Sequence, residues 1–262
     1  MSNDEFLKNV EDPPRRDEAR MSKIRRGGTN EAPRGESLSA CPSTSPESPV
    51  PSPALIRQRV RIRFTKQGDL RWLSHRDLMR TWERLFRRAV VPLGMTEGFH
   101  PKPRMNFPSA LAVGIAGDDE MLEIELSEAW PAERLREAIA GHAPPGLEVN
   151  QVEVMPPGNK KAQAVRVAFE AQVPEPRRGA ATERIVAFLA AASCEIAREG
   201  RSAPLDLRPL VEDLSLVDGT LKMRLRVDRE GSARPREVLA AVGLEDLELE
   251  GCPLTRTEVE IC

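Results

Sequence analysis

Strict alternation of apolar and polar residues in short segments is the feature that most constrains the fold of this chain. Val60, Ile62 and Phe64 alternate with Arg61, Arg63 and Thr65, which is the period of a strand with one buried face. Comparable alternation occurs in the segments 120–128, 147–155, 165–173 and 252–261. Strands of this kind are typical of antiparallel sheets that carry helices on one face only.

A helix is predicted to begin at Ser74, because Ser74 and Asp77 match the capping-box pattern. At 100° per residue, the apolar residues of this segment lie on one side of the helix and the arginines on the other. The apolar set is Leu78, Trp82, Leu85, Phe86 and Ala89. Pro92 and Gly94 are expected to end the helix.

Further along, the pattern predicts strands at 104–115 and 120–128, a helix at 131–143 and a strand at 147–155. The order is therefore β-α-β-β-α-β, which is that of a ferredoxin-like unit. The second half repeats this order, with a helix at 182–199 and a hairpin that turns at Asp218–Gly219. The predicted fold class is α+β, with two tandem ferredoxin-like units, at residues 55–158 and 163–262, made of antiparallel sheets with helices on one face.

Residues 1–54 hold eight of the 23 prolines and few large apolar side chains. Such a segment buries too little apolar surface to offset the entropy lost on ordering. We therefore expect residues 1–54 to be a disordered N-terminal tail.

Charge is segregated along the chain although the net charge is only −2. Residues 55–110 contain thirteen Lys and Arg against four Asp and Glu, a net charge of +9. Residues 111–160 contain three against ten, a net charge of −7. Partners are selected by local charge, because screening limits electrostatic reach to about 8 Å at physiological salt.

The basic segment concentrates its charge on one helix and the loop that follows. The candidate residues for binding nucleic acid or a protein partner are Arg76, Arg80, Arg84, Arg87, Arg88, His100, Lys102 and Arg104. Like charges four residues apart on a helix are mutually unfavourable, so something must offset them. Two explanations remain open: pairing within the chain, for example with Glu83 or the acidic segment, or a polyanion whose phosphates accept arginine forks.

The loop "GFHPKPR" is stiff, because residues that precede proline are restricted to extended conformations. His100 is a candidate general acid or base, and the alternative is an ordinary surface imidazole. On the exposed side of the sheet, Arg61 and Arg63 are expected to pair across strands with Glu123 and Glu125. This side carries no aromatic residue, so RNA contacts are expected to read the backbone rather than to stack bases on the sheet.

Other classes of site have little support. The four cysteines are scattered without metal-ligand spacing, so no cofactor and no metal are expected. The chain has no run of eighteen apolar residues and no secretory signal. These features predict a cytoplasmic protein with no membrane partner.

Two passages together resemble a known family: "FTKQGDLRWLSHRDLMRTWERLFRRA" and "EGFHPKPRMNFPSALAVGI". The sequence over 58–262 resembles a bacterial family of unknown function whose members are encoded beside, or fused to the C-terminus of, a radical SAM protein. Lys102 stands where many relatives are expected to carry a second histidine. More loosely, the same stretch looks like the RAMP superfamily of CRISPR repeat-processing endoribonucleases.

The resemblance implies a radical SAM protein as partner, and the basic helix suggests RNA. We therefore expect a non-catalytic accessory protein that binds RNA, such as tRNA or rRNA, for a radical SAM enzyme. One alternative is a metal-independent RAMP-like endoribonuclease that uses His100. Another is an adaptor that docks on the radical SAM enzyme without nucleic acid.

Overall fold

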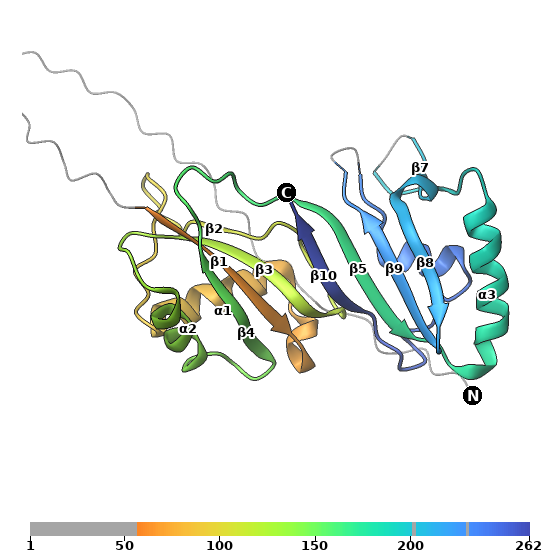
Figure 1. Ribbon diagram of the computed structural model, residues 1–262, viewed down its shortest axis with the longest axis horizontal. Coiled ribbons are helices and arrows are strands. Elements are labelled where there is room, and N and C mark those ends of the chain that lie inside the picture. Colours follow the sequence, from red (N-terminus) through yellow and green to blue (C-terminus); the bar gives the residue numbers. More distant parts are fainter. Residues whose placement is uncertain (1–56, 201–202, 229–230) are drawn as a thin grey trace, which may run out of the picture. The chain divides into compact units, whose positions relative to one another are not determined.

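The computed structural model describes residues 57–200, 203–228 and 231–262 (Figure 1). Contacts divide the chain into two units, and all described residues belong to the unit Pro51–Cys262. The tail expected at 1–54 lies outside the described residues. The described part is a mixed α+β fold with four α-helices and one large, mostly antiparallel sheet, which confirms the α+β part of the predicted fold class.

The sheet has eight strands, in the order β4-β1-β3-β10-β5-β9-β8, and β2 pairs with β3 beside this path. The first-half elements are β1 (Gln58–Lys66), α1 (His75–Arg88), β2 (Met105–Asn106), β3 (Ala116–Leu126), α2 (Ala132–Ala140) and β4 (Leu147–Val154). The second-half elements are β5 (Ala164–Gln172), α3 (Glu175–Ala190), β8 (Val211–Val217), β9 (Thr220–Arg226), α4 (Pro235–Ala241) and β10 (Thr255–Ile261). Short elements complete the set: η1 (Gly68–Trp72), η2 (Arg208–Leu210) and the paired strands β6 (Glu195–Ile196) and β7 (Leu205–Asp206).

The apolar residues of β1 form the base of the first core, as their alternation predicted. Val60, Ile62 and Phe64 are fully buried, and the edge of the Phe64 ring meets Trp82 of α1 at a centroid distance of 5.0 Å. The same core holds the inward side chains of both helices, such as Leu85 of α1 and Leu135 of α2. Helices α1 and α2 therefore cover one face of β1 and β3 (Figure 1).

The second half has its own core, formed by β5, β8, β9 and β10 with α3 and α4. Strands β8 and β9 form the predicted hairpin, in which Asp218 and Gly219 have φ angles of 51° and 81°. Positive φ at both central residues is the requirement of a tight hairpin turn, and Asp-Gly meets it at low cost. The predicted turn at Asp218–Gly219 is confirmed.

The two halves share one continuous sheet, whereas the sequence predicted separate sheets. Strands β3 and β10 pair in parallel, with Thr255 opposite Ala116 and Arg256 opposite Gly117. Next to this junction, the buried Arg256 donates hydrogen bonds from two guanidinium nitrogens to the buried Glu120 carboxylate. Arg256 Nε lies 2.7 Å from Glu120 Oε1. A Cβ at Gly117 would lie 2.6 Å from the Glu120 side chain, so glycine makes room for the pair.

Two predicted boundaries were wrong. Of the strand expected at 104–115 only Met105–Asn106 pairs. The strand expected at 120–128 begins earlier, because residues 116–119 also belong to β3. Pro108 has no N–H for a ladder, and the carbonyls of Ser109 and Ala110 accept hydrogen bonds from Arg256. The helix expected at 182–199 spans Glu175–Ala190, because a proline suits its first turn and Glu195–Ile196 pairs as β6.

We predict that Glu120→Ala lowers the free energy of unfolding by about 3–5 kcal/mol, because it leaves the Arg256 guanidinium buried without its counter-charge. The control is Glu258→Ala, which breaks an exposed pair with Arg224 and should cost no more than about 1 kcal/mol. Urea unfolding of the two variants measures the difference. Equal losses would contradict a structural role for the buried pair.

Candidate nucleic-acid interface

Helix α1 begins as its sequence predicted. The backbone N–H of Asp77 donates to Ser74 Oγ at 3.2 Å, and the Ser74 hydroxyl donates to Asp77 Oδ2 at 2.7 Å. The hydrogen bond from Ser74 lowers the pKa of Asp77 below its ordinary value. This cap, together with four buried apolar residues, fixes which side of α1 faces the core. The arginines consequently face outward.

All five arginines of α1 are exposed, and they have few partners in the described part of the chain. Arg80 Nη1 lies 3.3 Å from Asp77 Oδ1, which is a weak, exposed pair. Arg84 donates to Thr81 Oγ1 at 3.5 Å, and Arg88 donates to the His142 carbonyl at 3.0 Å. For Arg76 and Arg87 the described residues supply no hydrogen bond or ion pair. Glu83, the expected internal partner, pairs with none of the described arginines.

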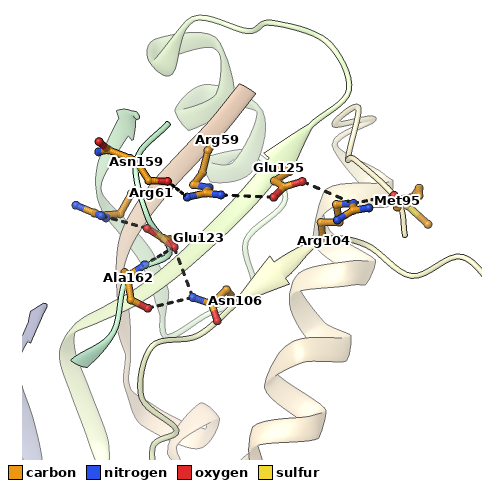
Figure 2. Close-up of polar contacts among 9 residues, drawn as sticks. All are labelled: Arg59, Arg61, Met95, Arg104, Asn106, Glu123, Glu125, Asn159 and Ala162. Carbon is orange, nitrogen blue, oxygen red and sulfur yellow. Dashed lines mark hydrogen bonds and ion pairs between the residues drawn. The ribbon is translucent and has the colours of Figure 1, made fainter. Parts of the chain in front are cut away.

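Arginines on the strands behave differently. Within residues 57–200, 203–228 and 231–262, every strand arginine pairs with a carboxylate, namely Arg59, Arg61, Arg63, Arg166, Arg224, Arg226 and Arg256. Figure 2 shows two of these pairs on the face of the sheet opposite the helices. By contrast, Arg80 alone among the α1 arginines has a carboxylate partner within the described residues.

The acidic segment 111–160 supplies the carboxylates of this opposite face. Arg61 Nη2 lies 3.1 Å from Glu123 Oε1, which confirms the predicted cross-strand pair. Arg63 pairs with Asp119 instead of Glu125. Glu123 is further held by the backbone N–H of Ala162 at 2.9 Å, from the linker before β5 (Figure 2). These carboxylates therefore pair with strand arginines and not with the arginines of α1.

The loop after α1 is held firmly at its root. Gly94 N–H donates to the Glu125 carbonyl at 2.6 Å, and Arg104 N–H donates to the Gly94 carbonyl at 2.8 Å. The Arg104 side chain donates through Nε to the Met95 carbonyl at 3.0 Å and lies 3.6 Å from Glu125 Oε2 (Figure 2). Arg104 therefore fastens the loop to the sheet and does not lie with the exposed basic residues.

The tip of the loop projects beyond a second closure. Thr96 N–H donates to the Lys102 carbonyl at 2.8 Å, and Lys102 N–H donates to Thr96 Oγ1 at 2.9 Å. Residues 97–101 lie beyond this closure, and all of them are exposed. The structure thus brings His100 and Lys102 together at an exposed tip.

Sequence reasoning missed Phe99, which is 102% exposed at this tip. An aromatic residue between Gly98 and His100 in a proline-bounded loop was the available signal. Periodicity arguments overlook it because the loop has no repeat.

A second missed feature is a buried polar group near the start of α1. Lys66 is 1% exposed, and its Nζ donates to the carbonyls of Arg71 and Leu73 at 3.3 and 3.1 Å. Burial lowers the pKa of Lys66. Nearby His75 has a buried Nδ1 without a hydrogen-bond partner and meets the Phe107 ring edge-on, at 5.3 Å between centroids. His75 packs into the structure and does not belong to the exposed basic face.

We predict that His75 makes stability depend on pH. Burial, with a smaller contribution from Lys66, holds the pKa of His75 below the ordinary 6.5. Between the two pKa values, His75 is therefore protonated in the unfolded chain and neutral in the folded protein. The free energy of unfolding consequently falls as the pH is lowered through 6.5 towards the pKa of His75 in the folded protein. His75→Gln should flatten this part of a plot of unfolding free energy against pH. An unchanged slope in the variant would show that other groups cause it.

Within the described residues, no helix is long and apolar enough to cross a membrane, and no group of three or more metal-ligating side chains occurs. No curated protein matches the chain. The crystal structure of an unknown protein from Galdieria sulphuraria shares 12% identity, covering 79% of this chain and 99% of that one. Its TM-score of 0.26 is too low to support an argument about fold or function. Residues 59–235 match DUF2344, described as an uncharacterized protein conserved in bacteria, and the chain belongs to this family.

Proposed function

We propose that this protein is an accessory protein that binds RNA, such as tRNA or rRNA, and presents it to a radical SAM enzyme. The binding surface consists of the arginine face of α1 (Arg76, Arg80, Arg84, Arg87 and Arg88) and the loop tip with His100 and Lys102. The observation that supports RNA is the pairing contrast. Strand arginines have carboxylates, whereas Arg80 alone among the α1 arginines has one within the described residues.

The energetics of α1 favour an anionic ligand. Each like-charged pair four residues apart costs about 0.2–0.5 kcal/mol, and 76/80, 80/84 and 84/88 are three such spacings. The carboxylates that pair with Arg61 and Arg63 lie on the opposite face of the sheet. Within the described residues a carboxylate reaches one α1 arginine, Arg80, through Asp77. A row of backbone phosphates would relieve the repulsion, because each guanidinium can bind a phosphate with two parallel hydrogen bonds.

The exposed face of the sheet determines whether RNA bases could stack on it. In RRM domains, bases stack on aromatic residues of an open sheet face. Here the corresponding face of the first half is occupied by ion pairs and by the linker at Ala162. Contacts from α1 would therefore go to the phosphate backbone, which gives affinity that depends strongly on salt.

We also propose that each half of the described chain is a ferredoxin-like unit. The strand orders β4-β1-β3-β2 and β10-β5-β9-β8 follow the same pattern in the two halves. This correspondence supports two ferredoxin-like units, each with two helices over one face. Such paired units are also what a RAMP-like relation would require.

The radical SAM partner rests on the sequence resemblance alone. Such an enzyme would carry its own cluster and chemistry, and this chain would supply the RNA surface. A nuclease role for His100 has less support, because the nearby cation Arg104, which could otherwise steady the phosphate, is held by Met95 and Glu125.

Replacing Arg80, Arg84 and Arg87 together by Gln should weaken RNA binding and reduce the salt dependence of the affinity. Loss of three phosphate contacts would lower the slope of log K against log salt by about 2 for single-stranded RNA. The matched control replaces Lys222, Arg224 and Arg226 of β9 by Gln, which removes the same charge from residues that have carboxylate partners. Filter binding at several salt concentrations measures both variants. Equal effects of the two triple variants would reject α1 as the RNA surface.

A tagged copy of the full chain should capture the radical SAM enzyme from its native host together with RNA. If the enzyme is retained through RNA, nuclease treatment releases it. If the enzyme docks directly on the arginines, capture survives nuclease and fails at high salt. RNA cleavage without divalent metal that disappears in His100→Ala would establish the nuclease alternative instead.

A further inference from the structure

Phe99 is unusual because its whole side chain faces water. It is 102% exposed, and it is absent from every ring-ring and cation-ring contact of the described residues. Burial is the rule for large aromatic side chains, because they contribute most to cores and interfaces. Both faces of this ring are available to a ligand.

Trp72, the second exposed aromatic residue in the described part of the chain, is not available in the same way. It is 59% exposed, but the Arg71 guanidinium lies over its ring, 4.7 Å from the centroid. A Cβ built on Gly114 would lie 3.2 Å from the Trp72 ring, so the chain also passes close to it. Among the described residues, Phe99 is thus the exposed aromatic ring without an intramolecular partner.

The loop presents this ring on a rigid support. Two hydrogen bonds between Thr96 and Lys102 close the tip, and Arg104 ties the root to the Met95 carbonyl. Pro101 and Pro103 restrict the backbone on one side of the ring. A group that is already ordered loses little entropy when it binds.

The charges around the ring indicate what kind of partner it meets. His100 and Lys102 are exposed beside it, while the acidic residue of the tip, Glu97, lies 3.4 Å from Arg57. An aromatic face next to cationic groups matches a nucleotide, in which a flat base is joined to a phosphate. An apolar protein pocket or a lipid tail would gain nothing from the adjacent cation.

We propose that Phe99 stacks on an unpaired base of the bound RNA while Lys102 contacts a neighbouring phosphate. This inference rests on the proposed function and narrows its substrate class. The ligand is an RNA with a single-stranded loop or an extruded base, not an uninterrupted duplex. The arginines of α1 supply affinity for the backbone, and the loop tip distinguishes unpaired from paired regions.

The test uses the full chain with two RNA probes that have equal numbers of phosphates: a hairpin with an unpaired loop and a blunt duplex. Wild-type protein should prefer the hairpin. Phe99→Ala should weaken hairpin binding by about 5- to 150-fold, the range measured for base stacking on aromatic residues, and leave duplex binding unchanged. Phe99→Trp should retain the preference. Leu249→Ala, which removes another exposed apolar side chain, is the matched control and should bind like wild type.

The outcomes separate this inference from the proposed function. If wild type binds both probes and Phe99→Ala matches it on the hairpin, the stacking role is overturned while RNA binding by α1 stands. If wild type binds neither probe, the proposed function fails and the stacking role with it. If Phe99→Ala loses capture of the radical SAM enzyme but not the hairpin, Phe99 contacts protein, and the inference is wrong.

Discussion

The pairing of β1 with β3 is the interaction on which the rest of this structure depends. One face of β1 is apolar and forms the base of the core under α1 and α2, with Phe64 against Trp82. The other face carries arginines, and the register of the pair places Arg61 opposite Glu123. Because Asp119, Glu123 and Glu125 pair with the arginines of β1 on this face, these three carboxylates do not neutralise α1. Part of the acidic segment thus neutralises the arginines of β1, whereas most arginines of α1 have no carboxylate partner within the described residues.

The joint between the halves rests on a different kind of contact. Strands β3 and β10 share only a short parallel ladder, at Ala116–Thr255 and Gly117–Arg256, and the buried pair of Glu120 with Arg256 lies beside it. A buried ion pair is a modest source of net stability, but it disfavours arrangements that leave either charge unpaired. This pair therefore contributes more to selecting the arrangement of the two halves than to the free energy of unfolding.

The arginine face of α1 and the loop tip both expose side chains that folded proteins usually pair or bury. On α1 these are guanidinium groups, and at the loop tip it is an aromatic ring. Arg76 and Arg87 lack partners in the described residues, and Phe99 leaves a complete aromatic ring exposed. The proposed ligand, with phosphates and unpaired bases, would use both groups at once. Membership of the DUF2344 family does not by itself identify that ligand, so the proposal rests on these residues.

The sequence by itself determined the local elements, because local rules govern them. Alternation predicted the buried face of β1, the pair Ser74 and Asp77 predicted the start of α1, and Asp218–Gly219 predicted the hairpin. Tertiary structure decided what depends on partners distant in the chain. It joined the two halves through one large sheet, turned Arg104 to the loop root, and left the α1 arginines other than Arg80 without a carboxylate partner in the described residues. Spacing along a helix shows which residues share a face, but only the folded chain shows which charges reach them.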